Sequence, residues 1–145
     1  METRSFPEIV SEHFAFMERH GFACTSSSKT KVRYESSKAY VEVSHGEQDG
    51  EVAISFGRLA PKEEFSFTLF LRKKNPVLEK QMGERLAATP NEVRDCVIKL
   101  GDALQSEGAE ILRGGDAPFD EMKDVRWWHF QPEALKKSSE HRPLQ

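Results

Sequence analysis

The sequence contains no long apolar segment. Nowhere among its 145 residues is there an apolar run of the roughly 18 to 20 residues that a membrane helix needs. The beginning, METRSFPEIV, is charged and lacks the apolar core of a secretory signal peptide. We therefore expect a protein without a membrane span and with a cytoplasmic location.

Cysteine is scarce, and so is any pattern typical of metal binding. The two cysteines, Cys24 and Cys96, lie far apart and match no metal-binding or redox spacing. The five histidines are scattered, without the spacing of a zinc site. We expect free thiols, as in a reducing compartment, with Cys96 packed in the core, and no metal or cofactor.

A strong charge of either sign is also missing. The net charge is -3, so the chain lacks the basic excess that is typical of a nucleic-acid-binding protein. Ten Phe and a hydrophobic content of 37% favour a folded core over disorder. The length fits one domain, which we place at residues 1–131. Residues 132–145 are rich in Lys, Ser, Glu and Pro and are expected to form a flexible tail.

The first expected element is a helix over residues 7–20. Pro7 suits the first helical position, and the apolar residues that follow recur at helical spacing. Gly21 stands where a helix often ends in the left-handed conformation.

Between residues 22 and 59 the apolar period changes from helical to two. Such alternation is typical of antiparallel strands with one buried face, and short polar segments separate the strands. We expect a meander of three or four strands, in which an opening strand near residues 24–29 has the weakest pattern. The alternating apolar residues are Val32, Tyr34, Val41, Val43, Val52, Ile54 and Phe56.

The second half of the chain favours helices. Residues 65–74 fit either a strand or a helix, and a cap at Ser66 favours the helix. A further helix is expected over residues 76–88. Thr89 and Glu92 form a capping box before a long helix that Gly108 ends. Ile111 and Leu112 are a short apolar pair, and a last short helix is expected to begin near residues 116–118.

Together these elements predict an α+β fold, with an N-terminal helix, a meander, and three to four helices packed on one face of the sheet. The other face, which would carry Arg33, Glu35, Tyr40 and Glu42, is expected to be open to solvent or to a partner. Arg33 and Tyr40 are therefore candidate binding residues.

The densest acidic group consists of Asp116, Asp120, Glu121 and Asp124. Carboxylates this close can bind a hard cation, but their spacing does not match an EF-hand loop. Acidic residues also stabilise the first turn of a helix, which is the interpretation that we favour. An acidic patch for a basic partner is the third interpretation.

Trp127 and Trp128 are the most unusual neighbours in the sequence. On a helix, adjacent side chains point about 100° apart, so both indoles cannot easily face one surface. We expect one to pack on the core and the other to cover an edge. The alternative is an anchor for a partner, because Trp is enriched in binding hot spots.

Several of these segments carry a resemblance to known proteins. Gly21-Phe22, Val32-x-Tyr34-Glu35-Ser36, Val41-x-Val43, Glu51-Val52, Gly57-Arg58-Leu59 and Thr89-Pro90-x-Glu92-Val93 resemble a set of small uncharacterised bacterial α+β proteins. The size and build are also similar to immunity proteins of bacterial toxin systems. That resemblance implies a protein that binds and blocks one toxin.

Three functions remain open at this point. The leading hypothesis is a non-enzymatic bacterial protein that binds one protein partner. A second is a small ligand-binding or enzymatic domain, with Tyr34, Tyr40 and Arg58 as candidate ligand contacts. A third is a structural subunit that associates with itself. The sequence leaves the oligomeric state undetermined.

Overall fold

The computed structural model describes residues 4–60 and 62–123. The chain begins with helix α1, Phe6–His13, followed by the 3-10 helix η1, Ala15–His20. Gly21 then adopts a φ of 83°, which confirms the left-handed helix end. The expected single helix over residues 7–20 is wrong, because the α-helix stops before Phe14. Phe14 and Phe16 are both buried with their rings 5.3 Å apart, whereas a continuous α-helix would point these side chains to nearly opposite faces.

The sheet is an antiparallel meander of five strands, where three or four were expected. In the order β1-β2-β3-β4-β5 the strands are Ala23–Ser27, Lys31–Glu35, Ala39–His45, Val52–Arg58 and Phe65–Ser66. The opening strand forms as predicted. The additional strand is β5, whose two residues are too few to show an alternating pattern.

Residues 65–74 turn out to be both strand and helix. Phe65 and Ser66 pair with β4, and helix α2, Phe67–Lys74, follows directly. The Ser66 hydroxyl accepts a hydrogen bond from the amide of Leu69 at 3.3 Å, which confirms the predicted cap.

Four more helices follow: α3 is Pro76–Met82, α4 is Pro90–Glu107, α5 is Ala109–Arg113 and α6 is Ala117–Met122. The described part thus has five helices after the sheet, because the apolar pair Ile111–Leu112 lies in a short helix that was not expected. The expected helix over residues 76–88 is too long. Gly83 adopts a φ of 67°, and the next residues run beside β4, where the amide of Val52 donates to the carbonyl of Arg85 at 2.8 Å.

Helix α4 begins as the capping box predicts. The Thr89 hydroxyl accepts from the Glu92 amide at 3.2 Å, and the Glu92 carboxylate accepts from the Thr89 amide at 3.1 Å. Cys96 is buried on this helix, as expected, and it is a free thiol.

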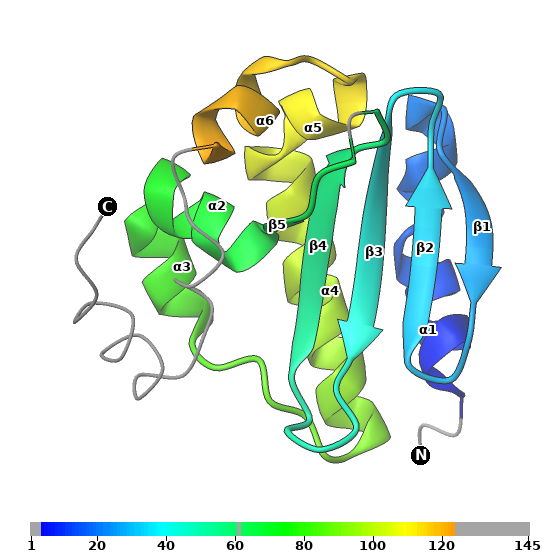
Figure 1. Ribbon diagram of the computed structural model, residues 1–145. Helices are drawn as coiled ribbons and strands as arrows, with labels where there is room; N and C mark the ends of the chain where they lie inside the picture. The colour runs from blue at the N-terminus through cyan, green and yellow to red at the C-terminus, as the bar shows by residue number, and fades with distance from the viewer. Residues whose placement is uncertain (1–3, 61, 124–145) are drawn as a thin grey trace, which may run out of the picture.

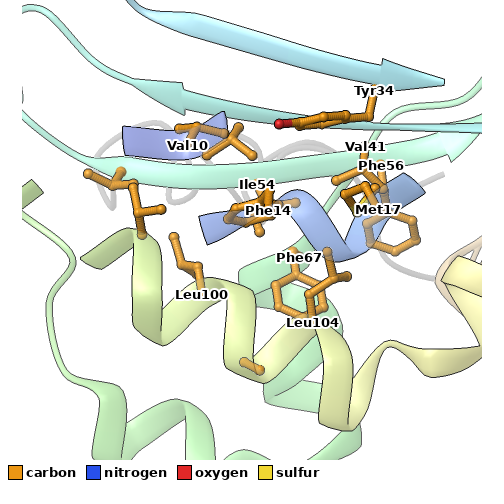
Figure 2. Packing of buried hydrophobic residues seen from close by; sticks show 14 of the residues in the cluster. Val10, Phe14, Met17, Tyr34, Val41, Ile54, Phe56, Phe67, Leu100 and Leu104 are labelled. Atoms are coloured by element: carbon orange, nitrogen blue, oxygen red, sulfur yellow. The ribbon is translucent and has the colours of Figure 1, made fainter. Parts of the chain in front are cut away.

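The helices lie behind the sheet or beyond its β5 edge, as Figure 1 shows. In Figure 2, Val10, Phe14 and Met17 from the N-terminal helical segment meet Leu100 and Leu104 of α4 beneath the sheet. The buried strand residues on this inner face include all those of the predicted alternation, namely Val32, Tyr34, Val41, Val43, Val52, Ile54 and Phe56, together with Ala39. The α+β class is thereby confirmed, with α1 and α4 packed on the inner face of the sheet.

Within the described residues, no helix combines the length and the apolar character that crossing a membrane would require.

Candidate functional site

The outer face of the sheet carries Arg33 as predicted, but Tyr40 is buried. The Tyr40 ring lies 3.9 Å from the Arg33 guanidinium carbon, and its hydroxyl donates to the Glu63 carbonyl at 2.8 Å. Only 3% of Tyr40 is exposed, so the expectation that it is open to a partner is wrong. The cause is the segment after β4, which folds over the ring where Gly57 pairs with Tyr40. A Cβ atom at Gly57 would overlap the Glu63 carbonyl, so glycine permits this close approach.

Arg33 itself is largely engaged within the sheet. Its Nε donates to the Glu35 carboxylate at 2.7 Å, and a second nitrogen lies 3.7 Å from the Glu42 carboxylate. Burial raises the pKa of the Tyr40 phenol above its ordinary value, so the ring beneath Arg33 is uncharged at neutral pH. On this part of the outer face one guanidinium therefore lies between two carboxylates, with Glu35 as its close partner.

The acidic group near α6 also has a partner within the chain. Asp116 and Asp120 approach Arg58 of β4, with nitrogen–oxygen distances of 3.3 Å and 3.2 Å. Arg58 also makes two bonds, of 2.9 Å and 2.8 Å, to the Glu63 carboxylate. These hydrogen bonds from Arg58 lower the pKa values of Glu63 and Asp120. The group therefore fastens α6 to the end of β4.

Asp116 occupies the position before α6, as the helix-start interpretation predicts, but its side chain binds Arg58 and makes no cap hydrogen bond. Glu121 is exposed on α6, and its carbonyl accepts from Lys73 at 2.7 Å. Among the described residues, no His, Cys, Asp or Glu cluster could hold a metal ion. Asp124, Trp127 and Trp128 lie outside the described residues.

Tyr34, Tyr40 and Arg58 do not form a common site. Tyr34 faces the inner side of the sheet and stacks on Phe14, with ring centroids 6.3 Å apart. Tyr40 lies on the outer face, and Arg58 binds the acidic group described above. The structure therefore does not bring these three candidate contacts into one site.

A more accessible feature is the edge of β1, with which no other strand of the described residues pairs. This strand is the first in the sheet order, and all five of its residues are exposed. Its sequence, ACTSS, contains no charged residue and no proline, the two residue types that most often blunt an edge. Within the strand, only the irregular register between Cys24 and Ser26 disfavours pairing with a further strand.

That irregularity also shapes the surface beside β1. The extra residue, Thr25, lets both Cys24 and Ser27 face the inner side, opposite Tyr34 and Val32 of β2. Here they line a groove of about 320 Å³ between β1 and the N-terminal helical segment. The helical wall consists of Pro7, Ser11, Phe14, Ala15 and Glu18.

The lining of the groove is about equally polar and apolar, and Glu18 is its single acidic side chain. Burial raises the pKa of Tyr34 to about 12, so this phenol is neutral in the groove at physiological pH. Sequence analysis could place β1 at an edge, because the first strand of a meander has one neighbour. It could not place α1 beside that edge, so the groove was missed.

The scan against protein-family models finds no match to this chain. Searches of curated proteins and of solved structures find no match either.

Proposed function

We propose that this chain is a protein-binding module that pairs β1 with an extended segment of one partner protein. The observation that carries the proposal is the fully exposed β1 edge, whose five residues include neither a charge nor a proline. A strand edge offers main-chain donors and acceptors in a row, and an added strand satisfies them.

The groove beside β1 supports the same function. A strand that continues the sheet would point alternate side chains toward the helical side, where Phe14 and Tyr34 line the groove. Phe14 and Val32 in the lining fit an apolar side chain, and Glu18 favours a basic residue beside it. An immunity-like role, in which the partner is a toxin, is the form of this function that the sequence resemblance suggests.

The test combines capture of a partner with hydrogen exchange. The tagged protein is used to isolate a stoichiometric partner from bacterial lysate, and exchange of the complex is compared with that of the free protein. We expect slowed exchange in residues 23–27. Protection restricted to other segments would refute strand addition at β1.

Ser11 provides a variant that blocks the groove without changing β1. Ser11 is exposed on α1, so Ser11→Arg places a long side chain across the groove with little effect on the core. We expect it to weaken binding at least tenfold. Ser106→Arg makes the same change at an exposed site on α4 and should leave binding unchanged. Equal effects of the two variants would contradict the proposed site.

Self-association through β1 is the competing outcome. Two copies that pair their β1 strands would form a dimer whose fraction rises with concentration, measured by analytical ultracentrifugation. If a dimer forms and Ser11→Arg dissociates it, the molecule that binds at β1 is a second copy of this chain and not a different protein.

A further inference from the structure

A second groove, on the opposite side of the sheet, lies along the edge of β4. Near its end β4 pairs with β5 through Ser55 and Ser66, and near its start the Val52 amide bonds to the Arg85 carbonyl. Between these two pairings the chain turns away into α2. The result is a groove of about 410 Å³ on the outer face, walled by the first turns of α2 and by Arg85.

Arg85 is an unusual residue to find in such a wall, because only 7% of it is exposed. One terminal nitrogen donates to the Gly83 carbonyl at 2.8 Å, and the other lies 3.6 Å from the Glu79 carboxylate. Its Nε is buried and has no hydrogen-bond partner. A buried guanidinium donor without an acceptor is costly, and this uncompensated positive charge favours an anion in the groove beside it.

The carboxylate beside Arg85 is shared with a second arginine. Arg72 of α2 contacts Glu79 through two bonds of 3.4 Å each. A charge-assisted hydrogen bond typically has a nitrogen–oxygen distance of about 2.7–2.9 Å. The distances from Arg72 to Glu79, and the 3.6 Å from Arg85 to Glu79, are longer than this. Two guanidinium groups thus share one loosely held carboxylate. With Lys31, this end of the groove has three cationic side chains against the carboxylates of Glu79 and Glu51.

Lys31 adds to the positive charge from the floor of the groove. The strand register places it in one row with Ser44 and Ala53. The next row toward β5 contains Glu42 and Ser55, and Glu64 lies further along the same side. Because residues on one face of a strand repeat every two positions, the rows are about 7 Å apart. Glu51 lies beyond the Ala53 row, at the same end of the groove as Arg85, because it pairs with Leu86.

The middle of the groove is less polar. Ala53, Phe65 and Leu69 contribute apolar surface between the cationic row and the acidic row. The first turn of α2 contains no acidic residue, so its helix dipole also favours a negative group nearby. The acidic side chains at the ends disfavour a ligand that is negative throughout.

We propose that this groove binds a small zwitterion whose carboxylate contacts Arg72 and Arg85 and whose ammonium group contacts Glu42 and Glu64. The Lys31 row and the Glu42 row are about 7 Å apart, which is about the length of an extended six-carbon amino acid. This ligand site is separate from the β1 edge, and its test does not depend on the protein-binding function.

Three probes of equal chain length separate the contributions of the two charges. They are ε-aminocaproate, with both charges, adipate, with two carboxylates, and hexylamine, with the ammonium group alone. Binding is followed by NMR through the amides of Ser66 and Thr68 and the Nε signal of Arg85. We expect ε-aminocaproate to bind most tightly and to shift the Arg85 signal. If none of the probes shifts these signals, or if hexylamine binds as tightly as ε-aminocaproate, the proposal is overturned.

Substitutions of Arg72 and Glu79 should change the affinity for ε-aminocaproate in opposite directions. Arg72 is exposed on α2, so Arg72→Gln should fold normally and weaken ε-aminocaproate about tenfold, as expected for the loss of one charge-assisted hydrogen bond. Glu79→Gln removes the competing carboxylate and should tighten binding several-fold. Lys99→Gln and Asp102→Asn make matched charge changes at exposed sites on α4 and should have no effect. If the α4 variants change the affinity for ε-aminocaproate as much as the groove variants do, the effect comes from the net charge of the protein alone and the proposed site is refuted.

Discussion

The packing around Phe56 leads to a specific prediction about the contacts between the sheet and the helices that follow it. Phe56 lies in β4 with no exposed surface. Its ring contacts four other phenylalanines, at centroid distances from 5.6 to 6.4 Å. These partners, Phe65, Phe67, Phe70 and Phe119, come from β5, α2 and α6, so one side chain joins three elements.

Replacing Phe56 by alanine should therefore lower the free energy of unfolding by a large amount. Truncation of a buried Phe to Ala typically costs about 3–5 kcal/mol, and the four ring contacts place Phe56 in the upper part of that range. A domain of this size has a free energy of unfolding of about 5–15 kcal/mol, so Phe56→Ala can prevent folding. Phe56→Leu should lower the free energy of unfolding by only about 1–2 kcal/mol, and it therefore provides a second variant that folds.

The assay is chemical denaturation followed by circular dichroism, with Phe65→Ala as the matched control. Phe65 is half-buried and its one ring contact among the described residues is Phe56, so its truncation should cost about 1 kcal/mol. A double-mutant cycle between Phe56 and Phe119 should give a coupling of about 0.5–1.5 kcal/mol. If Phe56→Ala costs no more than Phe65→Ala, or if the coupling with Phe119 is absent, the packing argument is wrong.

Three further predictions test the capping, the thiols and the ion pairs. Thr89→Ala removes the cap of α4 and should lower the free energy of unfolding by about 1 kcal/mol, measured by denaturant titration, with an unchanged slope. Cys24 is exposed and should react with Ellman's reagent in the native protein. Cys96, whose thiol pKa is raised by burial, should react only on unfolding, and rapid native reaction of both thiols would contradict the structure. The hydrogen bond from Arg58 lowers the pKa of Glu63, so the stability that it contributes is present above the ordinary glutamate pKa and is lost as the pH falls through the lowered value. Thermal unfolding between about pH 6 and pH 3 should therefore show a steeper loss for the native chain than for Glu63→Gln, and parallel curves would refute the coupling.

The elements that could be predicted from the sequence are those whose signals are local. The start of α4 depends on Thr89 and Glu92, which are three residues apart. The β2–β4 meander follows from alternation within short segments, because each strand buries one face. Errors occurred where a local pattern was overridden, as at Phe14, where the α-helix stops so that Phe14 and Phe16 can both enter the core.

The candidate sites depend on contacts between distant segments. Tyr40 was expected to be exposed because it alternates with buried valines, and it is buried by a carbonyl that lies 23 residues away in the sequence. Arg58 meets Asp116 across 58 residues, which no short-range pattern can indicate. The grooves beside β1 and β4 arise in the same way, from helices that pack at opposite edges of the sheet.

By itself, therefore, the sequence determined the α+β class, most helix starts and the buried face of the sheet. These features follow from the periodicity and capping of neighbouring residues, which act before any tertiary contact forms. Only the tertiary structure decided which charges are paired, which strand edge is free and where Arg72 and Arg85 share one carboxylate. Those outcomes depend on side chains that are brought together by packing, and their positions are set by the shape of the whole core.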